Sequence, residues 1–309
     1  MNTGPFKFKN LTHIYSNPKS IVGGIRYLGK EINRKYHKDY IKHEGCDIMK
    51  EDWDNLIILD GCRYDILSEK SFSGGNLEYR FSKGSQSKEF IEQNFLYKNL
   101  HDTVYITVNP FANIISENTF HYIHNLLDTH WDSNLKTVHP DKVTNIARRA
   151  AQEYKDKRLI VHYMQPHYPF IGKRGQEHET GSVSSDSTDN NMWDIFRFNI
   201  TNMDIEKVWD LYDENLDVVL NSVDRLRDDL IGKTVITSDH GNLFGEKLSP
   251  VPTRWYGHPP NLYVDELVQV PWLTFESDDR KDIRSDSPVG QVRVKKEEVN
   301  ERLEHLGYI

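Results

Sequence analysis

The chain has 309 residues, of which 37% are hydrophobic and 11% aromatic, and its formal net charge is −8 at pH 7. This length and apolar content suffice for one large α/β domain or two smaller ones. The acidic balance argues against nucleic acid as the main partner, because binding to a phosphate backbone needs a basic surface. Two cysteines, Cys46 and Cys62, are too few for a disulfide framework.

The first 50 residues are predicted to form a basic N-terminal extension. Nine Lys and Arg residues lie between Lys7 and Lys42, with tyrosines among them. Such a segment fits peripheral contact with an anionic membrane surface, and an ordinary solvated helix is the alternative. The amino terminus lacks an apolar signal-peptide core, and no stretch approaches the ~18 apolar residues of a spanning helix. We therefore expect a cytoplasmic protein.

Strand and helix patterns alternate along residues 51–309, which we expect to form the main domain. Apolar or β-branched runs predict strands at 55–59, 103–107, 158–163 and 234–237, and helical spacing marks 87–94, 143–154, 208–226 and 295–306. This alternation predicts a doubly wound, mostly parallel α/β sheet with helices on both faces. Residues 172–191 are polar and rich in Ser and Gly, which predicts a mobile surface insertion.

Polar side chains follow two of the predicted strands, at the edge where sites form in parallel sheets. Asp60 is the first polar residue after strand 55–59, and a carboxylate is a hard ligand for a divalent cation. After strand 234–237 the sequence SDHG places Asp239 and His240 side by side. This pair suits a metal ion or a reacting phosphate, and a solvated turn is the alternative.

Two serines in the sequence SKGSQSKEF lie at the mouth of a predicted helix. Ser85 or Ser87 would face the positive end of that helix, which favours an approaching anionic ester. A nearby metal ion would lower the pKa of the hydroxyl and make it a nucleophile. Capping of the helix is the alternative, and one serine could cap while the other attacks.

Two histidines lie in loops stiffened by Pro and Gly. The sequence MQPHYPF contains His167, and YGHPPNLY contains His258. With Asp60, Asp239 and His240 they form a set of ligands spread over strand ends, which is typical of one- and two-metal hydrolases. We expect one or two divalent ions, and Zn, Mn, Mg or Ca would each be compatible with such ligands.

Four pieces of the chain resemble the alkaline phosphatase/sulfatase superfamily, in particular its sulfatase-like branch of microbial and especially archaeal proteins. They are ILDGCRYD, KGSQSKEF, MQPHYPF and TSDHGNLFGE with the following YGHPPNLYVDELVQVPWL. The pieces occur in the same order as in the family, and the similarity spans about residues 54–275. The resemblance implies an alkaline-phosphatase-like fold.

The same resemblance implies roles for the candidate residues. Asp60, Asp239 and His240 would share a metal ion with the nucleophile, and His258 and His167 would bind a second ion or the substrate's anionic group. Alignment of GSQSKEF with lipoteichoic-acid-synthase-like members gives Ser85 as the nucleophile, which we slightly favour. Taking the residue before the helix gives Ser87 instead.

The chain departs from true sulfatases, which carry a Cys-x-Pro-x-Arg motif that is absent here. A phosphate ester is therefore favoured over a sulfate ester. We expect a metal-dependent hydrolase or transferase with a serine nucleophile, in which His167 positions the anion or assists the leaving group. The expected partner is an anionic ester such as a glycan or lipid head group. The alternative is a non-catalytic sulfatase-like protein that binds a glycan, lipid or protein partner.

Overall fold

The computed structural model describes residues 18–182, 192–198, 203–292, 294, 296–306 and 308. Its centre is an eight-stranded sheet in the order β10-β4-β3-β5-β1-β6-β9-β2. The strands from β10 to β6 run parallel, β9 is antiparallel to β6, and β2 is antiparallel to β9. The strands are β1 (Asn55–Leu59), β2 (Asn76–Phe81), β3 (Leu100–Thr107), β4 (Phe120–Asn125), β5 (Arg158–Tyr163), β6 (Thr234–Thr237), β9 (Gln269–Phe275) and β10 (Gly290–Val292).

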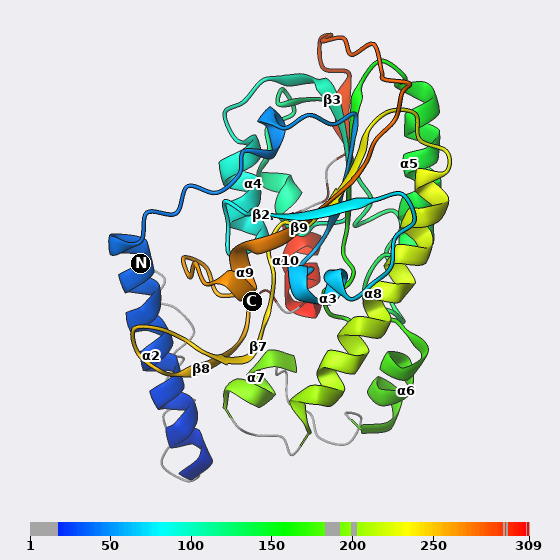
Figure 1. Cartoon of the computed structure of the whole chain (residues 1–309). Helices are drawn as coiled ribbons and strands as arrows, with labels where there is room; N and C mark the ends of the chain where they lie inside the picture. Colours follow the sequence, from blue (N-terminus) through cyan, green and yellow to red (C-terminus); the bar gives the residue numbers. More distant parts are fainter. Residues whose placement is uncertain are drawn as a thin grey trace.

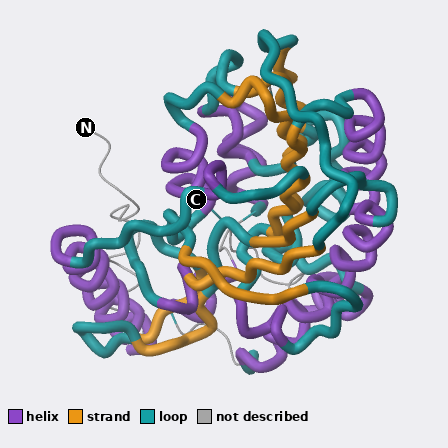
Figure 2. Tube along the Cα trace, turned by 45° about the horizontal axis from the view of Figure 1, so that its top comes forward, coloured by secondary structure: helices purple, strands orange, loops and turns teal. Residues whose placement is uncertain are grey.

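Helices surround this sheet, and a two-stranded hairpin lies beside it (Figures 1 and 2). The hairpin pairs β7 (Leu243–Lys247) with β8 (Arg254–Gly257). The helices are α2 (Pro18–Tyr40), α3 (Tyr64–Ser68), α4 (Ser87–Phe95), α5 (Pro140–Glu153), α6 (Lys173–Ser182), α7 (Met192–Arg197), α8 (Ile205–Arg227), α9 (Asp265–Val268) and α10 (Lys296–His305). Two short 3₁₀ turns are η1 (Ile48–Lys50) and η2 (Pro110–Ile114).

Strand β1 shows why the sheet is covered on both faces. All five of its residues are buried, and successive side chains point to opposite faces of a strand. Leu56 and Ile58 belong to a core cluster that includes residues of α4, whereas Ile57 and Leu59 belong to a second cluster with residues of α5 and α8. A strand buried on both faces has a continuous apolar sequence, as NLIIL does.

The expected doubly wound, mostly parallel sheet is confirmed. The predicted strands at 55–59, 158–163 and 234–237 match β1, β5 and β6, and the strand predicted at 103–107 begins earlier, at Leu100. The predicted insertion is partly helical, because α6 covers its first half, and residues 183–191 lie outside the described residues.

The N-terminal extension contains α2, and residues 1–17 lie outside the described residues. That the extension is a unit separate from the main domain stays a prediction. Among the described residues, no helix combines the length and the apolar character that crossing a bilayer requires.

Candidate active site

Three adjacent strands bring the candidate residues together. β1 lies between β5 and β6 and runs parallel to both, so their carboxyl ends meet at one edge of the sheet. Asp60 follows β1, and Asp239 and His240 follow β6. The backbone N–H of His167, in the loop after β5, donates to the Asp60 carbonyl over 3.1 Å. Residues separated by almost 180 positions are therefore neighbours.

Gly61 allows the chain to leave β1 at this crowded point. Its φ is +65°, a conformation that L side chains rarely adopt. A Cβ atom there would lie 3.4 Å from His167 Cδ2 and 3.6 Å from His240 Cε1. These are ordinary van der Waals distances, so it is the positive φ of the turn that requires glycine after Asp60.

Asp239 is held so that one carboxylate oxygen stays free. Its Oδ1 accepts from the backbone N–H groups of Gly61 over 3.0 Å and of His240 over 2.9 Å. Its Oδ2 has no hydrogen-bond partner among the described residues, and neither does His162 Nε2, which stands 3.6 Å away. Both side chains are fully buried. These two buried atoms lie at ion-pair distance without a hydrogen bond, so Asp239 Oδ2 is available to a further partner such as a cation.

His240 directs its second ring nitrogen to the same place. Its Nδ1 donates to the Gly241 carbonyl over 2.6 Å, so Nε2 is the nitrogen that a cation would bind. Nε2 lies 3.6 Å from Asp60 Oδ1 and 3.6 Å from Asp239 Oδ2. A backbone acceptor on the remote nitrogen is the usual arrangement for a metal-binding histidine.

Asp60 lies opposite these groups and is also oriented by neighbours. Asn109 Nδ2 donates to its Oδ2 over 2.7 Å, and the hydroxyl of Tyr308 lies 3.0 and 2.9 Å from its two oxygens. Burial and the adjacent charge of Asp239 raise the pKa of Asp60 well above its ordinary value. Burial also opposes ionisation of Asp239, but the neighbouring His240 and His162 more than offset it and hold the Asp239 pKa below its ordinary value.

These side chains fit a divalent cation. Asp60, Asp239 and His240 each offer one ligand atom, and the three atoms lie within 4.8 Å of one another. Two carboxylate oxygens and an imidazole nitrogen form a donor set that zinc and manganese both accept. A cation there would satisfy the free Asp239 oxygen and offset the burial and the repulsion from Asp239 that raise the Asp60 pKa.

The two candidate serines lie in different surroundings. Ser87 Oγ is 3.2 Å from Asp60 Oδ2 and 3.2 Å from His240 Nε2, so it belongs with Asp60, Asp239 and His240 in what we call the carboxylate cluster. Ser87 is the first residue of α4, and neither serine caps that helix, because Gln86 holds the N-cap position without a side-chain hydrogen bond.

Ser85 is bound to the polypeptide around it. Its Oγ lies 2.9 Å from the Pro259 carbonyl and 3.0 Å from Glu89 Oε2, and it accepts from the Leu262 N–H over 3.3 Å. Both serines are buried. The structure therefore brings Ser87 into the cluster and places Ser85 under the loop that carries His258.

His167 and His258 form a pair beside the cluster, which we call the histidine pair. Their Nε2 atoms are 2.8 Å apart, and His167 Nδ1 donates to the Tyr168 carbonyl. Burial, with a contribution from His240, lowers the pKa of His167 to about 4. Burial also lowers the pKa of His258 well below its ordinary value, with His240 and His167 adding to the effect. Both rings are therefore neutral near pH 7.

Three further residues belong to the site, and sequence reasoning did not find them. His162 lies inside β5, where the strand pattern hides it, and its Nδ1 hydrogen-bonds the Tyr105 hydroxyl over 2.8 Å. Asn109 follows β3, at the same edge as the other polar residues, and this position was the available signal. Tyr308 comes from the last residues of the chain, its ring stacks on His167 at 4.9 Å, and its hydroxyl lies 3.0 Å from Ser87 Oγ.

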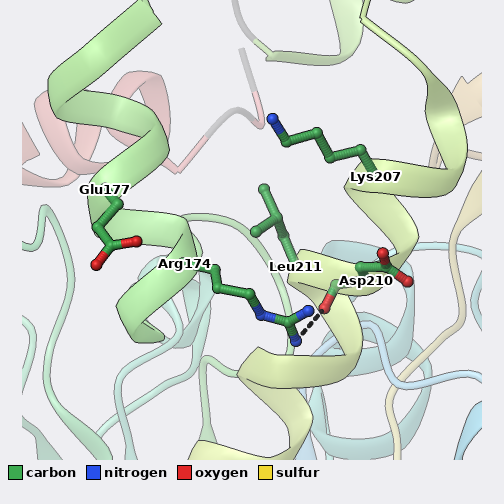
Figure 3. A pocket seen from close by; sticks show the side chains of 5 residues that line it. All are labelled: Arg174, Glu177, Lys207, Asp210 and Leu211. Atoms are coloured by element: carbon green, nitrogen blue, oxygen red, sulfur yellow. Dashed lines mark hydrogen bonds between the residues drawn. The ribbon is translucent and has the colours of Figure 1, made fainter.

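The candidate side chains of the site are all buried. A hollow of about 330 Å³ lies elsewhere, between α6 and α8 (Figure 3). It is lined by Arg174, Glu177, Lys207, Asp210 and Leu211, and Arg174 Nη2 donates to the Asp210 carbonyl over 3.3 Å. None of the candidate residues lines it. Access to Ser87 therefore requires a movement of the side chains that cover it.

No protein-family model matches the sequence, and no curated protein matches it significantly. Solved structures similar to the chain include the soluble domain of lipooligosaccharide phosphoethanolamine transferase A from Neisseria meningitidis. Its sequence identity to the chain is 12%, the match covers 72% of this chain and 76% of that one, and the TM-score is 0.46. Another is the C-terminal periplasmic domain of EcEptC from Escherichia coli in complex with zinc, with 14% identity, 76% coverage of each chain and a TM-score of 0.47.

A third similar structure is a protein in the alkaline phosphatase superfamily from Vibrio parahaemolyticus. Its identity to the chain is 13%, the match covers 91% of this chain and 75% of that one, and the TM-score is 0.40. This is the superfamily that the sequence motifs resemble. At such identities the roles of individual residues have to be argued from the geometry of this chain alone.

Proposed function

We propose that the protein is a metal-dependent enzyme that transfers the phosphoryl group of a phosphate ester through Ser87. One observation carries the proposal: a serine hydroxyl at a helix N-terminus lies 3.2 Å from a carboxylate and 3.2 Å from an imidazole, beside a carboxylate oxygen without a partner. The sequence slightly favours Ser85, but the hydrogen bonds of Ser85 to Pro259 and Glu89 support a structural role for it.

The proposed chemistry assigns a task to each side chain. A divalent cation held by Asp60, Asp239 and His240 would lower the pKa of the serine hydroxyl and offset the negative charge of the transition state. Ser87 Oγ bonds to phosphorus while the bond from phosphorus to the leaving oxygen breaks. The proton that Ser87 loses ends on the leaving oxygen, so an alcohol departs and a seryl-phosphate remains. Water or an acceptor hydroxyl then takes the phosphoryl group from Ser87.

The histidine pair has the properties of an anion-binding group. Neutral His167 keeps its N–H on the Tyr168 carbonyl and offers a lone pair at Nε2, so the proton between the two Nε2 atoms belongs to His258, which can donate it to a phosphoryl oxygen. Both rings lie beside Ser87 across the ring of Tyr308. A second metal ion at His167 and His258 would use the same nitrogens. In either case the 2.8 Å bond between the two rings is exchanged for bonds to the ligand.

Tyr308 covers the approach to Ser87. Its hydroxyl bonds to both Asp60 and Ser87, and its ring lies against His167, His258 and Phe111. A phosphate ester in line with Ser87 Oγ would need the space that this side chain fills. The proposed reaction therefore begins with displacement of Tyr308.

The class of ester and the place of the reaction stay predictions. A phosphate ester is proposed over a sulfate ester, because the chain lacks the Cys-x-Pro-x-Arg sequence and its free cysteines lie outside the cluster. A glycan or lipid head group is the proposed bearer of the ester. The cytoplasmic location is an expectation from the sequence alone.

The test combines metal analysis with trapping of the intermediate. Purified wild type, Ser87→Ala and Ser85→Ala are compared by elemental analysis and by turnover of p-nitrophenyl phosphate, bis-p-nitrophenyl phosphate and p-nitrophenyl sulfate. We expect a bound divalent metal in all three proteins, turnover of a phosphate ester by wild type and Ser85→Ala, and a phosphorylated Ser87 in acid-quenched wild type by peptide mass spectrometry. A protein without metal and without turnover would instead support the non-catalytic binding protein.

A further inference from the structure

Helix α2 carries an apolar stripe that is exposed in the described part of the chain. Val22, Ile25, Leu28, Ile32 and Tyr36 follow one another at spacings of three or four residues, which aligns them along one side of the helix. Ile25 and Leu28 are each 64% exposed, and Ile32 is 55% exposed. Of the thirteen exposed large apolar side chains in the described residues, seven lie between positions 22 and 41, so this exposure is concentrated on one element.

The other side of α2 is fixed to the molecule. Asn33 donates to the Val251 carbonyl over 2.8 Å and accepts from the Val251 N–H over 2.7 Å. His37 Nε2 lies 3.1 Å from the Ser249 carbonyl, and Lys30 is buried with its ammonium 4.8 Å from the Trp255 ring. The helix is thus anchored by a polar side while its apolar stripe faces solvent, the reverse of an ordinary core helix.

The anchored side also connects α2 to the candidate active site. Arg34 Nε donates to the Pro260 carbonyl over 2.6 Å, and Pro260 lies two residues after His258. The neighbouring Pro259 carbonyl accepts from Ser85. In Figure 1, α2 lies at one edge of the molecule beside β8, the strand that leads into this loop. If α2 binds a surface, the loop that carries His258 is therefore held at a fixed distance from that surface.

The charge of α2 indicates which surface that is. The helix contains six Lys and Arg residues and two acidic residues, a net charge of +4, whereas the chain as a whole carries −8. Lys35 and Lys38 are exposed alongside the stripe. We infer that α2 docks on an anionic lipid surface, with the stripe at the boundary between head groups and acyl chains and the lysines on the lipid phosphates.

A second copy of the chain fits this face less well. A symmetric dimer through the stripe would bring the exposed Lys35 and Lys38 of both copies toward one interface, and like charges at an interface oppose association. An anionic bilayer supplies the opposite charge and accepts a narrow apolar stripe without a shaped groove. Docking also places the site beside lipid head groups, which suits the proposed lipid-linked ester, but docking itself does not depend on catalysis.

Vesicle flotation of the full chain tests the inference. Vesicles of pure phosphatidylcholine are compared with vesicles that also contain phosphatidylglycerol. We expect binding only to the latter, and a loss on the order of a hundredfold in the Ile25→Ser, Leu28→Ser, Ile32→Ser triple variant. Lys35→Gln with Lys38→Gln should weaken binding about tenfold and reduce its salt dependence.

The matched control removes equally exposed apolar side chains elsewhere. Ile231 and Val289 are 63% and 61% exposed, and Ile231→Ser with Val289→Ser should leave vesicle binding within about twofold of wild type. Equal binding by the triple variant and this control, or equal binding to both kinds of vesicle, would overturn the inference. So would a wild-type dimer that becomes monomeric in the triple variant, since a second copy would then occupy the stripe.

The same proteins separate docking from catalysis. The triple variant should retain its turnover of p-nitrophenyl phosphate, because the substituted side chains face solvent. Ser87→Ala should retain its vesicle binding while losing turnover. An absence of turnover in every protein would therefore count against the proposed function and leave the docking result intact.

Discussion

The carboxylate cluster and the histidine pair are both buried, yet burial raises the pKa of Asp60 in the cluster and lowers the pKa of His167 in the pair. Burial and the neighbouring Asp239 raise the pKa of Asp60, which favours the protonated form of that one carboxyl group in the cluster. Burial lowers the pKa of His167 to about 4, so this ring is neutral near pH 7. The difference means that a cation bound at the cluster would favour the ionised form of Asp60, whereas His167 and His258 would meet a ligand as neutral rings.

The largest effect that we expect separates Ser87 from Ser85. Ser87→Ala should lower turnover by at least about a thousandfold, because it removes the proposed nucleophile from the carboxylate cluster. Ser85→Ala should lower turnover by less than about tenfold and the free energy of unfolding by about 1 kcal/mol, since it loses hydrogen bonds to Pro259 and Leu262. Steady-state kinetics and urea unfolding measure the two effects. The opposite ranking of turnover would return the nucleophile to Ser85.

The second prediction concerns the cation. Asp239→Asn should weaken zinc binding by more than about a hundredfold, because the amide cannot replace the free, charged Oδ2. Asn109→Ala removes only the group that orients Asp60, and we expect a loss of about ten- to a hundredfold. Competition with a chromophoric chelator measures both affinities without any assay of activity. Wild-type affinity in Asp239→Asn would exclude the cluster as the metal site.

The third prediction uses the histidine pair and the pH. The unfolded chain protonates His167 near its ordinary value of about 6.5, whereas the folded protein keeps it neutral down to about pH 4. The stability tied to His167 is therefore fully present above about pH 6.5 and is lost as the pH falls toward about 4, by about 3 kcal/mol. Urea unfolding of chelator-treated protein measures this loss. His167→Gln should reduce it, and an unchanged pH dependence in that variant would contradict the lowered pKa.

Much of the fold could be predicted because the residue types in each central strand by themselves indicate a buried strand. β1, β5 and β6 are almost entirely buried and consist mostly of apolar or β-branched residues, which the sequence alone shows. The antiparallel edge was missed for a physical reason. β9 contains Pro271, which argues against a strand in sequence, and β2 has mostly exposed or half-exposed residues that lack an apolar run. β2 and β9 are stabilised as strands by pairing with each other, and the sequence of neither segment indicates that pairing.

The candidate site was only partly predictable, because sequence order gives no distances. Asp60, Asp239 and His240 could be named from their positions after strands, and the structure places them together. The choice between Ser85 and Ser87 depends on which hydroxyl points at Asp60, and two residues of the same type at a helix mouth carry no such information. Tyr308 lies almost 250 positions from Asp60, and nothing in its local sequence indicates that contact.

The smallest effect that we expect tests the role of Tyr308, where the cluster and the histidine pair meet. Tyr308→Ala should raise kcat/KM for p-nitrophenyl phosphate about tenfold, mainly through a lower KM, because substrate no longer has to break the bonds of the phenol to Asp60 and Ser87. Tyr308→Phe keeps the ring against His167 and Phe111 and removes only the hydroxyl, so it should show a smaller gain. The affinity for inorganic phosphate as an inhibitor should rise in the same order. A lower kcat in Tyr308→Phe would instead show that the phenol takes part in the chemistry, and the side chain would then have to be counted with Ser87 and not as its cover.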